Sequence, residues 1–298
     1  MSSADNCEEA EGTSARCASC DIAENDDVKL KNCSACYLVR YCGVECQKEH
    51  RPQHKKECKK RAAELRDELL FKQPDSSCYG DCPICMIPLP LDPEKSSMCN
   101  CCSKVVCKGC EYANDKREME LRLVKSCPFC REPIPKTEEE WVKQRMKRIE
   151  ANDPAAMVQQ GGDHLIKGEY QSGFEYFAKA AALGNTWAHF NLACLYHEDV
   201  HEKIEADAGK MMYHLEEAAI GGHPGARHNL GLHENVPERA VKHFIIAATQ
   251  GEDNSIKALM EAFKMGWVEK EDLAAALRSH QAAVDATKSP QRDEAEKN

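Results

Sequence analysis

The stretch of sequence that decides the fold of the amino-terminal part is CASCDIAENDDVKLKNCSACYLVRYCGVECQKEHRPQHKKEC, residues 17–58. Its metal-binding side chains fall into four closely spaced pairs, which are Cys17 with Cys20, Cys33 with Cys36, Cys42 with Cys46, and His54 with Cys58. Thiolates and imidazoles are ligands that zinc prefers, and a structural zinc site takes four of them. Eight ligands therefore predict two zinc ions. Because so short a segment has little apolar bulk, we expect metal binding to stabilise it, by about 10–16 kcal/mol per structural zinc.

This series of ligand pairs, with Tyr41 before Cys42 and Gln47 after Cys46, resembles the MYND zinc finger over about residues 17–58. The resemblance implies that the pairs interleave around two ions. One ion would take Cys17, Cys20, Cys42 and Cys46, and the other would take Cys33, Cys36, His54 and Cys58. His50 is an alternative for the histidine position, but the spacing to Cys58 favours His54. The resemblance also implies binding of protein or peptide ligands, among them short proline-containing motifs.

A second series of closely spaced cysteines occupies residues 82–130. It consists of Cys82 with Cys85, a group of three cysteines at 99, 101 and 102, Cys107 with Cys110, and Cys127 with Cys130. Eight thiolates again suffice for two zinc ions, which makes four in the chain. The segments Cys82-Pro83-Ile84-Cys85 and Cys127-Pro128-Phe129-Cys130-Arg131 resemble those of a RING-type zinc finger, over about residues 81–133.

Cross-bracing of the RING type would place Cys82, Cys85, Cys107 and Cys110 on one ion, and Cys127, Cys130 and two of the three clustered cysteines on the other. Lys104 stands in the position usual for histidine, and an ammonium group cannot bind a metal ion. A neighbouring cysteine must replace it. We favour Cys101 with Cys102, and Cys99 with Cys102 is the alternative.

The RING resemblance implies a ubiquitin ligase that positions a ubiquitin-charged conjugating enzyme and has no catalytic nucleophile of its own. Ile84 and Pro128 would make apolar contacts with the conjugating enzyme, and Arg131 stands where a cation bridges that enzyme and ubiquitin. The MYND-type finger and the rest of the chain would then recruit the substrate. The alternative is a non-enzymatic zinc-binding scaffold whose modules only dock partner proteins.

The carboxy-terminal half contains an internal repeat. Small and apolar residues recur with the same spacing after Gly184, Gly222 and Gly251, at intervals of 38 and 29 residues, and an aromatic residue with an alanine pair precedes each glycine. The aromatic residues are Phe177, Tyr213 and Phe244. Repeats of this length are typical of stacked helical hairpins. We expect four hairpins over residues 152–282. Their spacing and composition resemble Sel-one-like repeats of the tetratricopeptide type, which implies protein binding rather than catalysis.

The expected fold class is therefore small zinc-stabilised α+β modules followed by an all-α solenoid of helical hairpins. The predicted organisation is a disordered acidic tail over 1–15, a MYND-type finger over 16–60, a helix and linker over 61–80, a RING-type finger over 81–135, a connecting helix over 136–151, repeats over 152–282 and a disordered tail over 283–298. Thr137 with Glu140 is typical of a helix start, as is Asp153 with Pro154.

Composition excludes some classes of function. The formal net charge is −10, whereas nucleic-acid binding needs a basic surface, so no specific nucleic-acid partner is expected. The sequence shows no signal peptide and no apolar run that could cross a membrane. We therefore expect a cytoplasmic or nuclear protein, in a compartment where clustered cysteines bind metal. Three cysteines lie outside both series of ligands and are predicted to be free thiols, namely Cys7, Cys78 and Cys194.

Overall fold

The structure of the chain is a computed structural model that describes residues 15–197 and 204–297. The predicted acidic tail over 1–15 lies almost wholly outside the described residues. Contacts between Cα atoms divide the chain into two units, Met1–Leu70 and Phe71–Asn298. Among the described residues, no helix is both long and apolar enough to cross a membrane.

The first unit is built around cysteine side chains. Strand β1 (Lys31–Asn32) pairs antiparallel with β2 (Arg40–Tyr41), and helix α1 (Val44–Leu70) follows. The buried cluster of this unit consists of three cysteines and Tyr41, which is 4% exposed. Such a core is too small to hold the fold together by apolar burial. Helix α1 begins well before the segment at 61 that the sequence marks as helical, so three of the predicted metal ligands lie on it.

The second unit begins with another small module. A 3₁₀ turn η1 (Pro93–Lys95) precedes β3 (Ser96–Cys99), which forms an antiparallel hairpin with β4 (Lys104–Cys107). Helix α2 (Lys108–Glu120) leads away from this hairpin. The buried cluster of this small module again consists mostly of cysteines, together with Leu89 and Val106. As in the first unit, the apolar core is minimal.

Helix α3 (Glu138–Glu150) connects this module to the repeats. The predicted start is confirmed, because the Thr137 hydroxyl accepts a hydrogen bond from the backbone N–H of Glu140 at 3.3 Å. Asp153 likewise caps the next helix through the N–H of Ala155, and Pro154 occupies the first turn. Both starts follow from local sequence alone.

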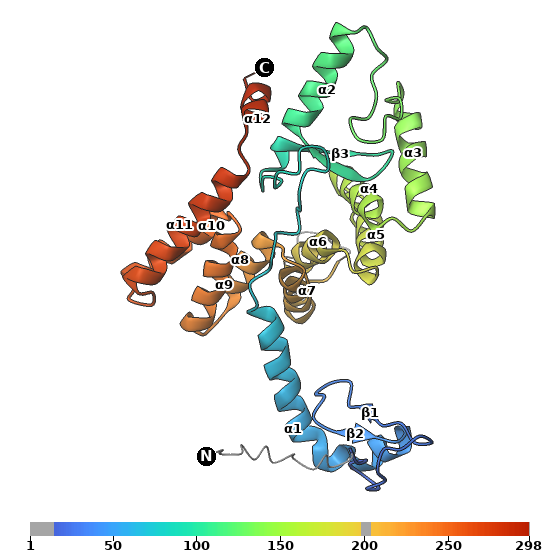
Figure 1. The fold of residues 1–298 in the computed structure, drawn as a ribbon, viewed down its shortest axis with the longest axis vertical. Coiled ribbons are helices and arrows are strands. Elements are labelled where there is room, and N and C mark those ends of the chain that lie inside the picture. The colour runs from blue at the N-terminus through green and yellow to red at the C-terminus, as the bar shows by residue number, and fades with distance from the viewer. Residues whose placement is uncertain (1–14, 198–203, 298) are drawn as a thin grey trace, which may run out of the picture. The chain divides into compact units, whose positions relative to one another are not determined.

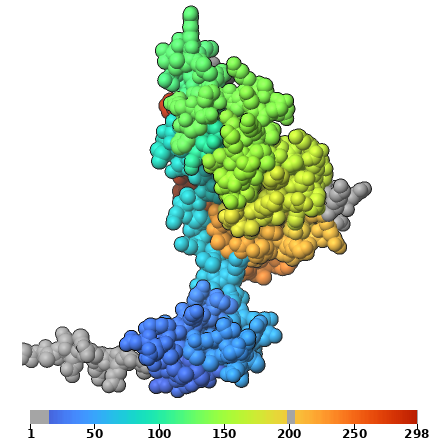
Figure 2. Space-filling view, turned by 90° about the vertical axis from the view of Figure 1, so that its right-hand side faces the viewer, coloured from blue at the N-terminus to red at the C-terminus, as the bar shows by residue number. Residues whose placement is uncertain are grey.

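Four helical hairpins follow α3 in the described part of the chain, stacked one beside the next (Figure 1). Their helices are α4 (Pro154–Ile166), α5 (Tyr170–Ala182), α6 (Thr186–His197), α7 (Ala208–Ile220), α8 (Pro224–His233), α9 (Pro237–Thr249), α10 (Asp253–Lys264) and α11 (Lys270–Ala286). The fold class expected from the sequence, small modules followed by an all-α repeat region, is confirmed. On the face shown in Figure 2, the small module of this unit and the repeats form one continuous surface.

The repeated glycines end the second helix of successive hairpins. Gly184, Gly222 and Gly251 have φ angles of 77°, 83° and 92°, which residues with side chains rarely adopt, and each comes one residue after the cap that ends α5, α7 or α9. The residue four positions after each glycine is completely buried where consecutive helices approach closely. These residues are Ala188, Ala226 and Ser255.

One aromatic position departs from the predicted repeat. Phe177 and Phe244 are buried, but Tyr213 is 53% exposed. Leu215, 2% exposed, takes the equivalent core position, three residues before the alanine pair. The repeat therefore requires a large apolar side chain there and does not require an aromatic one.

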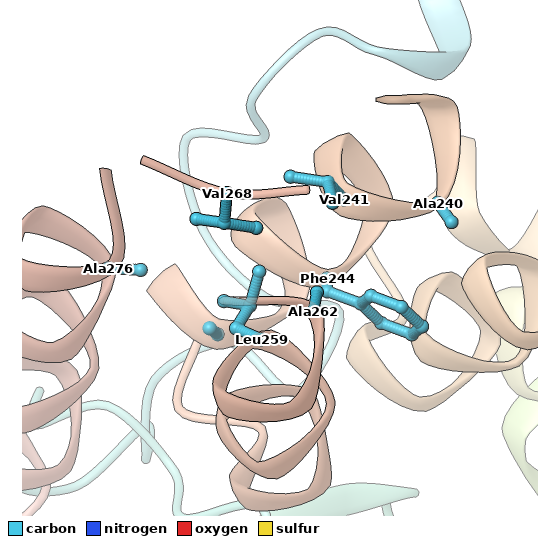
Figure 3. Close-up of a cluster of buried hydrophobic side chains, with 8 residues drawn as sticks. Ala240, Val241, Phe244, Leu259, Ala262, Val268 and Ala276 are labelled. Carbon is cyan, nitrogen blue, oxygen red and sulfur yellow. The ribbon is translucent and has the colours of Figure 1, made fainter. Parts of the chain in front are cut away.

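The last two hairpins share a compact core. Phe244 and Leu259 pack with Val268 and Ala276, which come from α9, α10, the loop after α10, and α11 (Figure 3). The ring of Phe244 lies where a Cβ on Gly231 would stand, 2.5 Å from one ring carbon, so only glycine fits at that position of α8. This close approach accounts for the tight α8–α9 hairpin.

The carboxy terminus differs from the predicted disordered tail over 283–298. Helix α11 continues to Ala286, and a short helix α12 (Pro290–Ala295) follows, with Ser289 as its cap. Helix α12 lies beside α2 of the small module (Figure 1). Its Arg292 is only 7% exposed. The contact joins segments far apart in the sequence, which no local pattern indicates.

Candidate metal centres

Four groups of cysteine and histidine side chains converge in the described part of the chain. Within each group the possible ligand atoms lie within 4.8 Å of one another. The groups are Cys17, Cys20, Cys42 and Cys46 (group 1), Cys33, Cys36, His54 and Cys58 (group 2), Cys82, Cys85, Cys107 and Cys110 (group 3), and Cys101, Cys102, Cys127 and Cys130 (group 4). The side chains that the sequence assigns to a common ion are the side chains that lie together.

Group 1 joins a loop to the start of helix α1. The Sγ of Cys42 lies 3.6 Å from that of Cys20 and 3.5 Å from that of Cys46. Sulfur atoms bound to one tetrahedral zinc at about 2.3 Å lie roughly 3.8 Å apart. The donor set and its spacing therefore fit a zinc ion.

Group 2 distinguishes between the two candidate histidines. Nε2 of His54 lies 3.1 Å from Sγ of Cys36, and the His54 side chain is buried. His50 instead places its Nδ1 3.1 Å from the hydroxyl of Tyr41, with its ring stacked on that of His54. His50 thus supports the ligand from outside, and the alternative that made it a ligand is not favoured by the geometry.

Group 3 lies at the centre of the second small module. Sγ of Cys85 lies 3.8 Å from Sγ of Cys107, and Cys82 is completely buried. The backbone N–H of Cys107 donates to Sγ of Cys82 at 3.5 Å, and that of Cys110 donates to Sγ of Cys107 at 3.4 Å. Such N–H groups stabilise negatively charged sulfur, as a zinc site requires.

Group 4 uses two of the three clustered cysteines. Sγ of Cys101 lies 3.3 Å from Sγ of Cys130, and Sγ of Cys102 lies 3.9 Å from Sγ of Cys127. Cys99 is outside the group, although its thiol is hydrogen-bonded to Cys127. The geometry therefore favours Cys101 with Cys102 over the alternative pair. Cys78 and Cys194 also lie outside all four groups, and Cys7 falls outside the described residues.

In every group, one cysteine has a lowered pKa, which favours the thiolate that binds metal. It is the first cysteine of a knuckle, meaning the tight turn formed by two cysteines with two residues between them. Burial raises the pKa of each of these thiols, but hydrogen bonds from backbone N–H groups, most of them in the same knuckle, outweigh it. The resulting pKa is about 6 for Cys17 and Cys33, and about 7 for Cys82 and Cys127. Their partners keep their protons more tightly; the neighbouring thiols raise the pKa of Cys42 to about 12. Metal binding must therefore release protons from the remaining ligands.

The three predicted contact residues for a conjugating enzyme all reach the surface of the second module. Ile84 is 41% exposed, Pro128 is half-buried and Arg131 is exposed. The structure adds Phe129, whose ring is also 41% exposed although it lies between two ligands. Its place between Cys127 and Cys130, in a segment with little apolar core, is the feature of the sequence that favours this exposure.

Two buried polar residues that the sequence analysis missed anchor the last cysteine knuckle of the second module, Cys127 to Cys130. Asn114 on α2 donates to the carbonyl of Ser126 at 3.2 Å and accepts from Arg131 at 2.5 Å. Glu118, 2% exposed, accepts from both the N–H and the hydroxyl of Ser126. Burial raises the pKa of Glu118, but these hydrogen bonds lower it more, so the carboxylate remains charged.

Comparison with known proteins gives two findings. The family model of the MYND finger matches residues 17–58. Among solved structures, the chain is similar to a Sel1 repeat protein from Oxalobacter formigenes (18% identity, TM-score 0.44, covering 59% of this chain and 74% of that one). It is also similar to a protective antigen of uropathogenic Escherichia coli with an SLR fold (20% identity, TM-score 0.40, covering 55% of this chain and 37% of that one). The chain thus carries a match to the MYND finger over residues 17–58, and its helical repeats rest on the hairpins described above.

Proposed function

We propose that the chain is an interaction adaptor that binds four zinc ions and acts as a RING-type ubiquitin ligase through its second module. The observation that carries this proposal is the interleaved order of groups 3 and 4. The first and third cysteine pairs form one group, and the second and fourth form the other. This cross-braced order is what the RING resemblance implies, and the second module combines it with exposed Ile84 and Arg131.

Each zinc ion would be held by one of the four groups, with all sixteen side chains named above as ligands. Zinc would supply no catalytic chemistry in this protein. It would fix loops whose apolar core is too small to do so. The consequence is a rigid surface on which Ile84 and Pro128 are presented at fixed positions.

The ligase chemistry would be positioning. Ile84 and Pro128 would make the apolar contact with a ubiquitin-conjugating enzyme, and the guanidinium of Arg131 would donate hydrogen bonds to carbonyl groups of that enzyme and of ubiquitin. A planar guanidinium suits a bridge between two partners better than an ammonium group does. Restricting the thioester to an attack-ready geometry accelerates transfer without a nucleophile from this chain. The MYND finger and the repeats would recruit the substrate protein.

A second candidate function is a scaffold without ligase activity. The observation that favours it is the hydrogen bond between Arg131 and Asn114, because it engages one nitrogen of the guanidinium within the module. In that case all the modules would serve as docking surfaces for partner proteins.

An autoubiquitination assay against a panel of conjugating enzymes separates the two functions. We expect activity with at least one enzyme of the panel and its loss in Arg131→Ala, with zinc content unchanged. Arg122→Ala is a matched control, since Arg122 is also exposed in this module and also has a positive φ, 55° against 65° for Arg131. It should retain activity. Silence of the wild-type protein across the panel would favour the scaffold.

A further inference from the structure

The carboxy-terminal helix α12 inserts one arginine into the second module, beside group 3. Arg292 is 7% exposed although it lies six residues from the end of the chain. Its Nη1 donates to the carbonyl of Pro88 at 2.7 Å and to that of Thr287 at 2.6 Å. Burying a charged side chain is costly unless it is fully hydrogen-bonded.

The second terminal nitrogen of Arg292 faces the cysteine loop. Nη2 donates to the carbonyl of Ile87 at 3.0 Å and approaches Sγ of Cys85 at 3.5 Å. The two terminal nitrogens carry four N–H bonds, and all four have an acceptor, whereas the buried Nε–H has none. The fixed fork of a guanidinium can satisfy these four acceptors at once, whereas the ammonium of lysine has three donors on a single atom.

The rest of α12 is fitted to the other cysteine knuckle of the same group. Gly109 lies between Cys107 and Cys110, and a Cβ at that position would stand 3.0 Å from Cα of Arg292. Gln291 donates from Nε2 to the carbonyl of Gly109 at 3.1 Å. The helix thus contacts both cysteine knuckles that would hold one ion.

Two exposed ion pairs flank this contact. Lys116 on α2 lies 2.9 Å from Glu294, and Lys95 lies 2.8 Å from Glu296. Ion pairs this exposed add little to stability, because solvent screens them. They orient α12, but the buried arginine is the contact that distinguishes this packing from a loose association of a tail.

We propose that Arg292 is an outer-shell residue of the zinc site formed by group 3, so that the carboxy terminus of the repeat region sets the affinity of that site. A zinc ion with four thiolates carries a formal charge of −2, and a buried guanidinium in contact with a ligand sulfur stabilises it. Outer-shell partners of metal ligands typically change metal affinity by about 10- to 100-fold when removed. The inference rests on the proposed zinc occupancy of the second module and does not require ligase activity.

The contact leaves the proposed enzyme-binding surface uncovered, since Ile84 and Phe129 remain 41% exposed with α12 in place. Helix α12 therefore supports the metal site and does not cover that surface. It also ties the zinc site to the last hairpin, because only the segment 287–289 separates α12 from α11.

The test is the rate at which zinc passes from the intact protein to a coloured chelator. In Arg292→Ala we expect about one of four zinc equivalents to leave roughly 10- to 100-fold faster than in the wild type, with the other three unchanged. Arg292→Lys, which keeps the charge and loses the fork, should fall between the two. Arg278→Ala is the matched control, because Arg278 is an exposed arginine of α11, and it should behave as the wild type.

A chain that ends at Lys288 lacks α12 and should release zinc as Arg292→Ala does. Added peptide of residues 285–298 should slow the release again, and the same peptide with Arg292→Ala should not. Circular dichroism checks that the repeats stay helical; if Arg292→Ala fails that check, Arg292→Lys decides. Four tightly held zinc equivalents in every variant would overturn the proposed role of Arg292 while leaving the zinc proposal intact. A wild type that binds no zinc in the second module would overturn both.

Discussion

The guanidinium of Arg131 donates a hydrogen bond to the side-chain oxygen of Asn114 at 2.5 Å, which ties the last cysteine knuckle of the second module to helix α2. Asn114 is 8% exposed and also donates to the carbonyl of Ser126. Arg131 itself adopts a φ of 65°, unusual for a residue with a side chain, so its direction is set by the backbone as well as by this bond. In the ligase proposal this bond positions Arg131 for ubiquitin transfer, whereas in the scaffold alternative it withholds one nitrogen of the guanidinium from a partner.

Asn114→Ala should slow ubiquitin transfer less than Arg131→Ala does, because it removes the support of the arginine and leaves the arginine itself. The measurement is the autoubiquitination rate of both single variants and the double variant at equal zinc content. If Asn114 acts through Arg131, the double variant is no slower than Arg131→Ala alone. Additive losses would show that Asn114 has a separate role.

Zinc content should separate the three clustered cysteines. Cys101→Ser removes a member of group 4, so it should lower the zinc content by about one ion per chain, whereas Cys99→Ser should leave it unchanged. Elemental analysis of both purified variants checks this. The reverse result would mean that Cys99, which is hydrogen-bonded to Cys127, is the true ligand.

The local parts of this structure were predictable from the sequence, and the reason is physical. Most of the metal ligands come in pairs with two or three residues between them, so Cys82 with Cys85 can be assigned without knowing the rest of the fold. Repeat glycines such as Gly184 mark helix ends for an equally local reason, their positive φ. The ion shared by two distant pairs is not local, and only the family resemblance indicated which pairs combine.

Acidification should destabilise the repeats through His223. Its ring is 3% exposed between Trp187 and Phe190, and burial lowers its pKa from 6.5 to about 4. Between these values the unfolded chain binds the proton and the folded chain does not, so stability is present above pH 6.5 and is lost as the pH falls toward 4. At pH 5 the loss is about 2 kcal/mol.

His223→Asn isolates this effect, since asparagine can still accept the hydrogen bond that His223 receives from the N–H of Ala226 at 3.1 Å and cannot gain a proton. Urea unfolding followed by circular dichroism at pH 7 and pH 5 gives the free energies. The wild type should lose about 2 kcal/mol more than the variant over this range. Equal losses in the two proteins would exclude His223 as the titrating group.

Leu259→Ala should weaken the carboxy-terminal hairpins by about 2–5 kcal/mol, because Leu259 is completely buried in the core shown in Figure 3. Repeat stability is mostly a matter of neighbouring repeats, so the amide protons of α9, α10 and α11 should exchange faster while those of α4 and α5 change little. Hydrogen exchange resolves the two regions. Uniform acceleration along the chain would show that the repeats unfold as one cooperative unit.

The features that escaped sequence analysis depend on distant contacts. The segment 283–298 is polar and charged, and its contacts with the second module, such as those with Ile87 and Gly109, explain why α12 is ordered. Tyr213 is a different case. It stands five residues before its alanine pair, whereas Phe177 and Phe244 stand three residues before theirs, so Leu215 occupies the core position instead.

The zinc stoichiometry of the intact protein tests the central claim most directly. That claim is that zinc, bound by four groups of cysteine and histidine ligands, stabilises the fold of each small module. Elemental analysis of purified protein should find about four zinc ions per chain, and chelation should unfold both modules while leaving the helical signal of the repeats largely in place. Far fewer than four ions in a protein whose two modules are still folded would contradict the account.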